Sequence, residues 1–347
     1  MKADKIVIPR WFDRHLHLRT REMLKAVLPC TLNQRATGAV IMGNLPYPYE
    51  TSSIEKTLVY QKEILSLVPQ GCDFRPRMTC YLTDDITPEE VVRGFEEDVW
   101  CAVKLYLAGQ GGTTGSRHGV KNLSGRYRVF EAMEKRGIPL LGHFEVVEPE
   151  VDEFDREIVS VERDLFPILA SFPGLPVVVE HVTDGRTADF VAEANRNIQA
   201  TVTPHHLTFN RNEMFFNGMN PSFYCKPVLK NEKHRLWVRK YVTSGNRRFG
   251  AGTDSAPHYE ENKACWYGCA AGIFTAPLAI KMYAKIFDED DASENLSMFL
   301  SENFLHLYGM EVSSEMMTIE RTSQPQQGIG TMQIFGREIE LPWRIAG

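Results

Sequence analysis

The stretch Val177-Val178-Val179-Glu180-His181-Val182 contains the pattern that decides the fold. A short run of β-branched residues, typical of a buried strand, ends in polar side chains that can do chemistry. Similar runs recur along the chain, and amphipathic, helix-like stretches lie between them. The predicted strands are 5–12, 39–45, 75–82, 99–105, 139–144, 177–182, 198–203 and 248–253.

The alternation of strands and helices favours a parallel sheet of the α/β class, and eight units over about 250 residues fit a (β/α)8 TIM barrel. A doubly wound open sheet is the alternative. No GxGxxG or Walker loop follows the first predicted strand, which removes the commonest use of that fold but not the fold itself. We expect a single domain over 1–347, with a small C-terminal extension that ends in a hairpin. The predicted helices include 51–67, 88–97, 125–135, 157–170, 187–194 and 232–243.

Composition and charge narrow the class of protein. Of 347 residues, 43% are hydrophobic and 24% are charged, which indicates an ordinary globular protein rather than a disordered one. The formal net charge is −6 and no Lys/Arg-rich run is present, so neither nucleic acid nor a membrane surface is expected as a partner. No apolar run approaches the ~18–20 residues that a membrane span needs.

The cysteines indicate a reducing compartment. There are seven, an odd number scattered along the chain without a CxxC pair, so free thiols are expected rather than disulfides. Cys265 and Cys269 stand four apart, which makes a zinc knuckle improbable. The chain opens without a secretory leader, and we expect a cytoplasmic protein.

Histidines stand at the C-terminal ends of several predicted strands, where a barrel builds its active site. His15 and His17 form a His-x-His pair, and residues two apart on an extended backbone point to the same side, so both imidazoles can hold one ion. His205 and His206 follow another strand and are expected to support the site rather than to bind metal. The predicted ligands are His15, His17, Lys104, His143, His181 and Asp254.

Imidazole and carboxylate ligands suit zinc and similar divalent metals, cobalt and manganese included. Six such groups exceed one tetrahedral site and fit two metals that share a bridge. A protonated Lys104 would be repelled by two cations, whereas burial favours its neutral amine, which can add carbon dioxide to become a bridging carbamate. Each residue alone has an ordinary explanation as a surface or turn residue, and only their coincidence at strand ends favours the metal hypothesis.

These residues resemble a known family. The segments His15-Leu-His17-Leu-Arg19, Lys104-Leu-Tyr106, Thr203-Pro-His-His-Leu207, Cys225-Lys-Pro227 and Asp254-Ser-Ala-Pro-His258, with His143 and His181, are similar to those of the amidohydrolase superfamily. Within it they most resemble dihydroorotases of the compact, stand-alone bacterial type. The resemblance spans most of the chain in the right order.

The resemblance implies a reaction and a role for each residue. The reaction is the reversible cyclisation of N-carbamoyl-L-aspartate to L-dihydroorotate in pyrimidine biosynthesis, with a metal-bridging hydroxide as the nucleophile and Asp254 as the general acid/base. Two zinc ions bridged by carboxylated Lys104 are implied, and a homodimer is expected because related enzymes are often dimers. Arg19, Asn44 and His258 would bind the substrate carboxylate, and the backbones of Cys225 and Ala270 would bind the edge of the pyrimidine ring.

The glycine-rich loop after the strand that carries Lys104 is a candidate lid. In the family a Thr-Thr pair there contacts substrate, which favours a lid role for Thr113 and Thr114 over an ordinary surface loop. Two alternative functions remain open. One is another cyclic amidase, resembling hydantoinase or dihydropyrimidinase, and the other is a catalytically silent barrel that serves as a scaffold.

Overall fold

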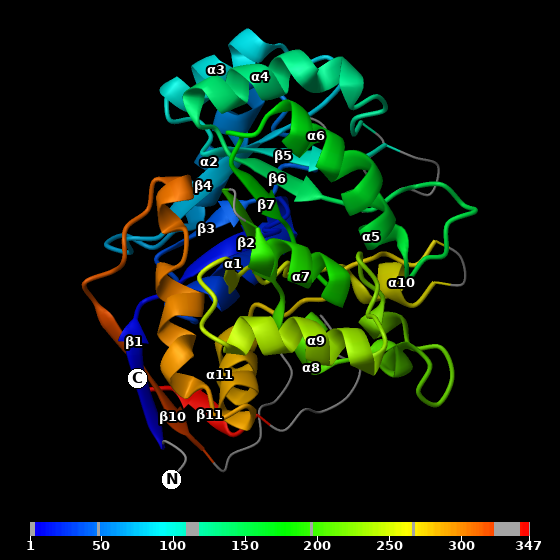
Figure 1. The fold of residues 1–347 in the computed structure, drawn as a ribbon. Coiled ribbons are helices and arrows are strands. Elements are labelled where there is room, and N and C mark those ends of the chain that lie inside the picture. The colour runs from blue at the N-terminus through cyan, green and yellow to red at the C-terminus, as the bar shows by residue number, and fades with distance from the viewer. Residues whose placement is uncertain are drawn as a thin grey trace.

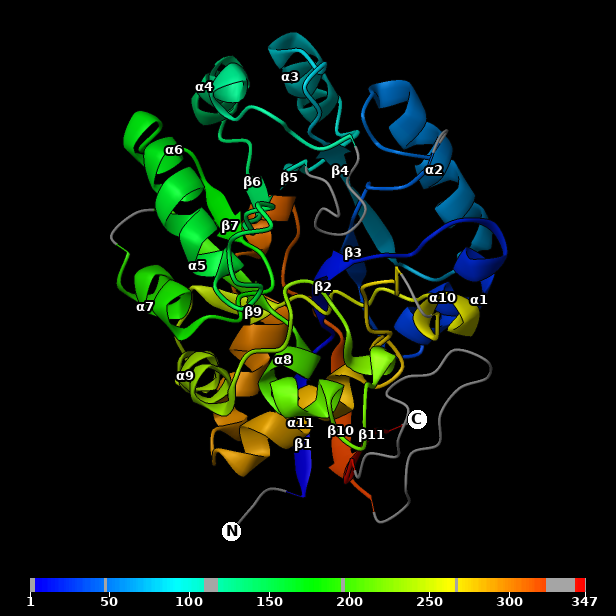
Figure 2. The ribbon, with the colours of Figure 1, turned by 90° about the vertical axis from the view of Figure 1, so that its right-hand side faces the viewer.

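A computed structural model describes residues 4–46, 49–108, 118–194, 197–265, 268–322 and 341–346 of the chain. Eight parallel strands follow one another in sequence order around a barrel, with helices outside them (Figures 1 and 2). The predicted (β/α)8 fold is therefore confirmed. The strands are β2 (Phe12–Leu16), β3 (Gly38–Ile41), β4 (Arg75–Tyr81), β5 (Ala102–Tyr106), β6 (Leu140–His143), β7 (Val177–Val179), β8 (Ile198–Val202) and β9 (Phe249–Ala251).

The helices begin where the sequence carries caps. The Thr87 hydroxyl accepts the main-chain N–H of Glu90, with Pro88 in the first turn of its helix, and the Asn231 side chain accepts the N–H of His234 in the same way. The predicted helix 157–170 is interrupted by a π-helical turn, Val161–Leu165. The helices are α1 (Arg21–Leu32), α2 (Ile54–Leu67), α3 (Pro88–Glu96), α4 (Tyr127–Arg136), α5 (Arg156–Ser160), α6 (Phe166–Ser171), α7 (Gly185–Glu193), α8 (Pro204–Thr208), α9 (Glu232–Thr243), α10 (Glu260–Lys263) and α11 (Ala279–Glu289).

The prediction of one strand over 5–12 is wrong. Strand β1 (Lys5–Pro9) lies outside the barrel, and the first barrel strand is β2. β1 alternates exposed and buried side chains, as a strand covered on one face does, whereas every residue of β2 is buried. The sequence of β2 is polar, so hydrophobicity pointed to its apolar neighbour instead.

A small antiparallel sheet joins the two ends of the described chain. Strand β10 (Met316–Arg321) pairs with β1 on one side and with β11 (Trp343–Ile345) on the other. Figure 1 shows these three strands together below the barrel, beside α11. The expected C-terminal extension with a hairpin-like end is thus present, and it includes the N-terminal strand as well.

The C-terminal segment also closes one end of the barrel. Phe304 and Tyr308 pack in one cluster with the buried strand residues Val40, Leu141 and Val178. The Asn303 amide donates to the carbonyl of Phe249, the first residue of β9, so the segment lies at the N-terminal ends of the strands. The opposite end is left for the site.

Polar side chains hold the seam where β9 meets β2. The Asp13 carboxylate accepts the main-chain N–H of Thr253 at 2.9 Å and the Thr253 hydroxyl at 2.6 Å, and it also accepts the N–H of His15 at 3.1 Å. Beyond these contacts, Leu16 forms a parallel bridge with Ser255, and the N–H of Asp254 donates to the carbonyl of His15 at 2.9 Å. One buried carboxylate and these main-chain contacts together hold the seam.

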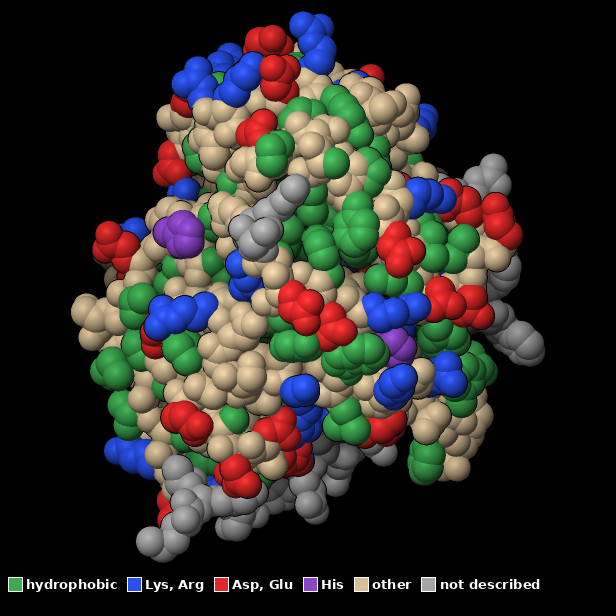
Figure 3. Space-filling view, in the orientation of Figure 1, with side chains coloured by type: hydrophobic (Ala, Val, Ile, Leu, Met, Phe, Trp, Pro, Cys, Tyr) green, Lys and Arg blue, Asp and Glu red, His purple; other side chains and the backbone are tan. Residues whose placement is uncertain are grey.

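The charged side chains on one face of the molecule are of both signs (Figure 3). Lys, Arg, Asp and Glu side chains are interspersed on the face shown in Figure 3, without a field of one sign. Among the described residues, no helix combines the length and the apolar character that a membrane crossing requires.

Removing the Asp13 carboxylate should weaken the closure of the barrel. We expect Asp13→Ala to lower the free energy of unfolding by about 3 kcal/mol, because the buried N–H groups of Thr253 and His15 lose their acceptor. Urea unfolding measures the change. Glu131→Ala, which removes an exposed carboxylate paired with Lys135, should change the free energy of unfolding by no more than about 0.5 kcal/mol. Equal unfolding midpoints for the two variants would contradict this account of the seam.

Candidate active site

The six predicted ligands meet at the C-terminal end of the barrel, and all six are buried. β2 carries His15 and leads directly into His17, β5 carries Lys104, and β6 ends at His143. His181 and Asp254 follow β7 and β9 by two and three residues. Both have left-handed backbones, with φ of 44° and 43°, a conformation that side-chain-bearing residues rarely adopt and that is frequent at functional sites.

Three of these side chains converge on one carboxylate oxygen. Asp254 Oδ1 lies 3.3 Å from His15 Nε2 and 3.1 Å from His17 Nε2, and the two imidazole nitrogens are 3.4 Å apart. His15, His181 and Asp254 can each present one donor atom within 4.8 Å of the others. The His-x-His pair thus faces the end of β9 across the barrel seam, as its spacing predicts.

The remaining histidines form the other side of the cluster. His143 Nδ1 lies 2.9 Å from His181 Nε2. The far nitrogen of His143, Nε2, lies 2.8 Å from the Glu145 carboxylate, which is completely buried. Glu145 therefore accepts the Nε2 proton of His143 and leaves Nδ1 to face the cluster.

Lys104 reaches the cluster through a glutamate that the sequence analysis left out. Its Nζ donates to Glu180 Oε2 at 2.8 Å, and the same oxygen lies 2.5 Å from His15 Nδ1. Lys104 and Glu180 are both completely buried. Nζ also lies 4.6 Å from the ring centre of Tyr106.

Burial sets the protonation of the site. It lowers the pKa of His17 to about 4 and the pKa of His181 well below its usual value, so both imidazoles are neutral with free lone pairs at neutral pH. Burial also lowers the pKa of Lys104, towards the neutral amine. Burial opposes ionisation of Asp254, but the charge of His15 and hydrogen bonds from His15 and His17 outweigh it and hold its pKa well below the usual range.

The cluster therefore has the donors and the charge that a metal ion needs. Burial disfavours the charged form of His15, yet the carboxylates of Glu180 and Asp254 outweigh it and raise its pKa to about 9, so a cation is strongly favoured here. Nδ1 of His17 and Nδ1 of His181 are buried without a hydrogen-bond partner in the described part of the chain. Neutral imidazoles beside a carboxylate are the ligands that zinc and related metals prefer.

Two of the predicted substrate residues lie together beside this cluster. Arg19 Nη2 is 3.1 Å from His258 Nε2, and Arg19 Nε donates to the carbonyl of Pro257 at 3.0 Å. Burial, with the positive charge of Arg19, lowers the pKa of His258 to about 3, so this imidazole is neutral at neutral pH. The pair combines a fixed positive charge with a neutral hydrogen-bonding ring. Asn44 follows β3 by three residues and is half-buried.

The backbone groups predicted to bind the ring edge are held by a lysine that the sequence analysis missed. Lys263 Nζ donates to the carbonyls of Tyr224, Ala270 and Gly272 at 2.8, 3.0 and 2.8 Å. It thereby ties the segment before Cys225 to the segment that contains Ala270. The Ala270 N–H donates to the carbonyl of Asn262 at 2.9 Å, so this N–H already has an acceptor within the chain.

A second group of possible ligands consists of His205, His206 and Cys225. Both ring nitrogens of His206 are already engaged, by the Thr203 hydroxyl and by the carbonyl of Pro227. This arrangement favours the supporting role expected for His206. His205 is completely buried, and neither of its ring nitrogens has a hydrogen-bond partner among the described residues.

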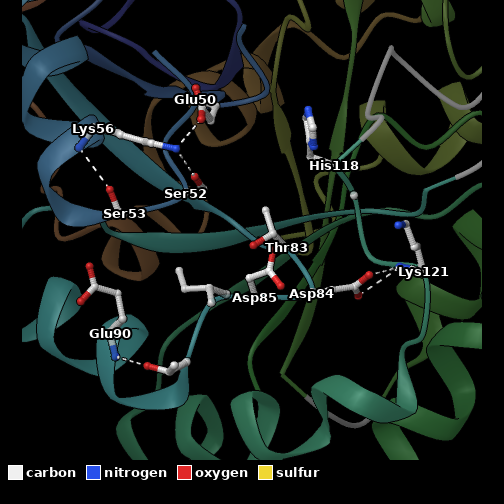
Figure 4. Close-up of a pocket in the computed structure, with 13 residues that line it drawn as sticks. Glu50, Ser52, Ser53, Lys56, Thr83, Asp84, Asp85, Glu90, His118 and Lys121 are labelled. Carbon is white, nitrogen blue, oxygen red and sulfur yellow. Dashed lines mark hydrogen bonds and ion pairs between the residues drawn. The ribbon is translucent and has the colours of Figure 1, made fainter. Parts of the chain in front are cut away.

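A polar cavity of about 790 Å³ opens near the ends of β4 and β5. Figure 4 shows two contacts among its lining residues, between Lys56 and Glu50 and between the main chain of Lys121 and Asp84. None of the six predicted ligands lines it. The candidate lid residues Thr113 and Thr114 lie outside the described residues.

The missed residues share a recognisable pattern. Glu180 directly follows the run of valines that forms β7, and Glu145 stands two residues after His143. A carboxylate in such a position is seldom buried unless it is paired. Proximity in sequence to a predicted ligand is the feature that could have identified both.

Known proteins resemble the chain along its whole length. No family model matches it. A dihydroorotase from Synechococcus sp. (strain CC9902) is 45% identical over 345 residues, covering 99% of this chain and 98% of the relative. The crystal structure of dihydroorotase from Saccharomyces cerevisiae in complex with 5-fluoroorotic acid superposes with a TM-score of 0.88 at 27% identity, covering 99% of both chains.

Hydantoinases share the fold at a greater distance. The L-hydantoinase (dihydropyrimidinase) of Arthrobacter aurescens superposes with a TM-score of 0.76 but only 13% identity. The superposition covers 91% of this chain and 76% of the hydantoinase chain. That likeness concerns the fold alone. An identity of 45% over nearly the full length of both proteins shows that this chain belongs to the dihydroorotase family.

Proposed function

We propose that this enzyme interconverts N-carbamoyl-L-aspartate and L-dihydroorotate with the help of two zinc ions. The observation that carries the proposal is the buried cluster in which Asp254 Oδ1 lies within 3.3 Å of both His15 and His17. His15, His17, Lys104 and Asp254 would hold one ion, and Lys104, His143 and His181 would hold the other, with Lys104 carboxylated. When bound, the ions would polarise the substrate carbonyl and make water nucleophilic near neutral pH.

Asp254 would move the proton in this reaction. Its carboxylate remains ionised at neutral pH for the reasons given above, so it can accept a proton from water. In ring opening it would pass that proton to the ring nitrogen as the amide bond breaks. In ring closure the same transfers run in reverse.

Arg19 and His258 would bind the substrate carboxylate. A guanidinium presents two parallel N–H groups that match the two oxygens of a carboxylate. The neutral ring of His258 adds a hydrogen bond without a second positive charge, and Asn44 would complete this group. Main-chain groups of Cys225 and Ala270 would bind the ring edge, with Lys263 holding both segments in place.

We also propose a single-domain chain that acts as a cytoplasmic homodimer. The contacts of Asn303 and Tyr308 with the barrel support one domain, because the C-terminal segment completes the barrel core. Phe215, Phe216 and Met219 are exposed and apolar, as in surfaces that a second subunit covers. Thr113 and Thr114 are proposed as substrate contacts of the lid.

The metal proposal is tested by zinc content and turnover. Purified protein should hold two zinc ions per chain, and chelation should abolish both ring opening and ring closure, followed by the ultraviolet absorbance of dihydroorotate. Lys104→Ala should hold less zinc and lose about two orders of magnitude or more in kcat, because the bridging ligand is gone. Small carboxylic acids should restore part of the activity. Wild-type turnover in this variant would exclude the bridge.

Asp254→Asn tests the proton transfer. The amide keeps an oxygen that can face a metal but cannot accept a proton, so kcat should fall by about 10²–10⁴-fold while KM changes little. Steady-state kinetics at matched zinc content separates this effect from loss of metal. An unchanged kcat would remove Asp254 from the proton transfer.

Arg19→Met tests recognition of the substrate carboxylate. Loss of the guanidinium should raise KM about 10–100-fold, with a smaller effect on kcat, because the contact is made before and during the reaction. Arg21→Met is the matched control, since Arg21 is exposed at the start of α1. A normal KM for Arg19→Met would favour a cyclic amide without a ring carboxylate as the substrate.

A further inference from the structure

Glu180 occupies an unusual place for a carboxylate. It directly follows β7, and its side chain is completely buried. Val178, two residues earlier, packs in the cluster that fills the barrel, so the alternation along the strand directs Glu180 to the same interior. A carboxylate in such a position requires partners that offset its desolvation.

The two partners of Glu180 come from different strands. Oε2 lies 2.5 Å from His15 Nδ1 of β2 and 2.8 Å from Lys104 Nζ of β5. A nitrogen lone pair and a carboxylate oxygen 2.5 Å apart would repel each other, so we assign a proton of His15 to Nδ1, the nitrogen beside Glu180. Nε2, which lies 3.3 Å from Asp254 Oδ1 and 3.4 Å from His17 Nε2, is then the nitrogen whose proton a metal ion would replace.

The contact with Lys104 is compatible with carboxylation. Conversion of the amine to a carbamate leaves one N–H on Nζ, and this N–H can still donate to Glu180. A fixed N–H direction also fixes where the other substituent of Nζ points. The carbamate would then project away from Glu180.

We propose that Glu180 is a positioning residue that orients His15 and Lys104 together and so couples the geometry of the two metal positions. The inference rests on the proposed zinc function. Carboxylates that accept the far N–H of a ligating histidine raise metal affinity and fix the ring, and their loss costs about 10–100-fold in affinity. Glu180 differs from Glu145 in that one oxygen serves two ligands.

A matched control exists in the same part of the barrel. Glu157 is also buried, but its carboxylate accepts the main-chain N–H groups of Thr183 and Asp184 and contacts no predicted ligand. Substitution of Glu157 therefore removes a buried carboxylate that has no contact with His15 or Lys104. The two glutamates separate a positioning role from a structural one.

The experiment measures zinc affinity of the full chain by competition with a chromophoric chelator. We expect about tenfold weaker zinc binding in Glu180→Gln and a larger loss in Glu180→Leu, because the amide is a weaker acceptor and leucine accepts nothing. Glu157→Gln should bind zinc as the wild type does, within about twofold. The visible spectrum of cobalt-loaded protein should change only in the Glu180 variants.

Circular dichroism and thermal unfolding establish that each variant is folded. If Glu180→Leu does not fold, the zinc affinities of Glu180→Gln and Glu157→Gln test the positioning role of Glu180. A folded Glu180→Gln with wild-type zinc affinity and cobalt spectrum overturns the proposal. A wild-type protein that holds no zinc overturns the metal proposal, and this inference with it.

Discussion

The closure of the barrel between β2 and β9 is the constraint on which the site depends. Asp13 accepts hydrogen bonds from Thr253 across this seam, and Asp254 is the next residue along the chain. His15 lies two residues after Asp13 and meets Asp254 directly. The contacts that close the sheet thus bring the His-x-His pair to its carboxylate, so an opening of the seam would separate His15 from Asp254.

The interior of the barrel is divided between packing and chemistry along its axis. Near the N-terminal ends of the strands, Val40, Leu141 and Val178 pack against the C-terminal segment as an apolar plug. Towards the other end, the buried side chains of Lys104 and Glu180 lie 2.8 Å apart, from Nζ to Oε2. The apolar layer keeps water away from the charged layer, which strengthens the electrostatic interactions there.

The predicted ligands lie together in the structure, whereas the strand that carries His15 was predicted at the wrong place. Strand ends such as those at His143 and His181 were identifiable because apolar runs precede them. The sequence of β2 is polar, so the apolar β1 was predicted as the first barrel strand in its place. β2 is buried because its polar side chains have partners in distant segments, such as Thr253. Glu180 was missed for the same reason. Its significance comes from contacts with His15 and Lys104 on two other strands, and the sequence marks it only by its place next to His181.

The small sheet has a consequence for synthesis on the ribosome. β1 is among the first segments to leave the exit tunnel, yet its partner β10 is translated some three hundred residues later. The plug around Tyr308 also arrives late. The N-terminal end of the barrel therefore stays uncovered until translation is nearly complete. We therefore expect the nascent chain to expose apolar surface of the barrel strands until its last segments are made, which favours aggregation at that stage.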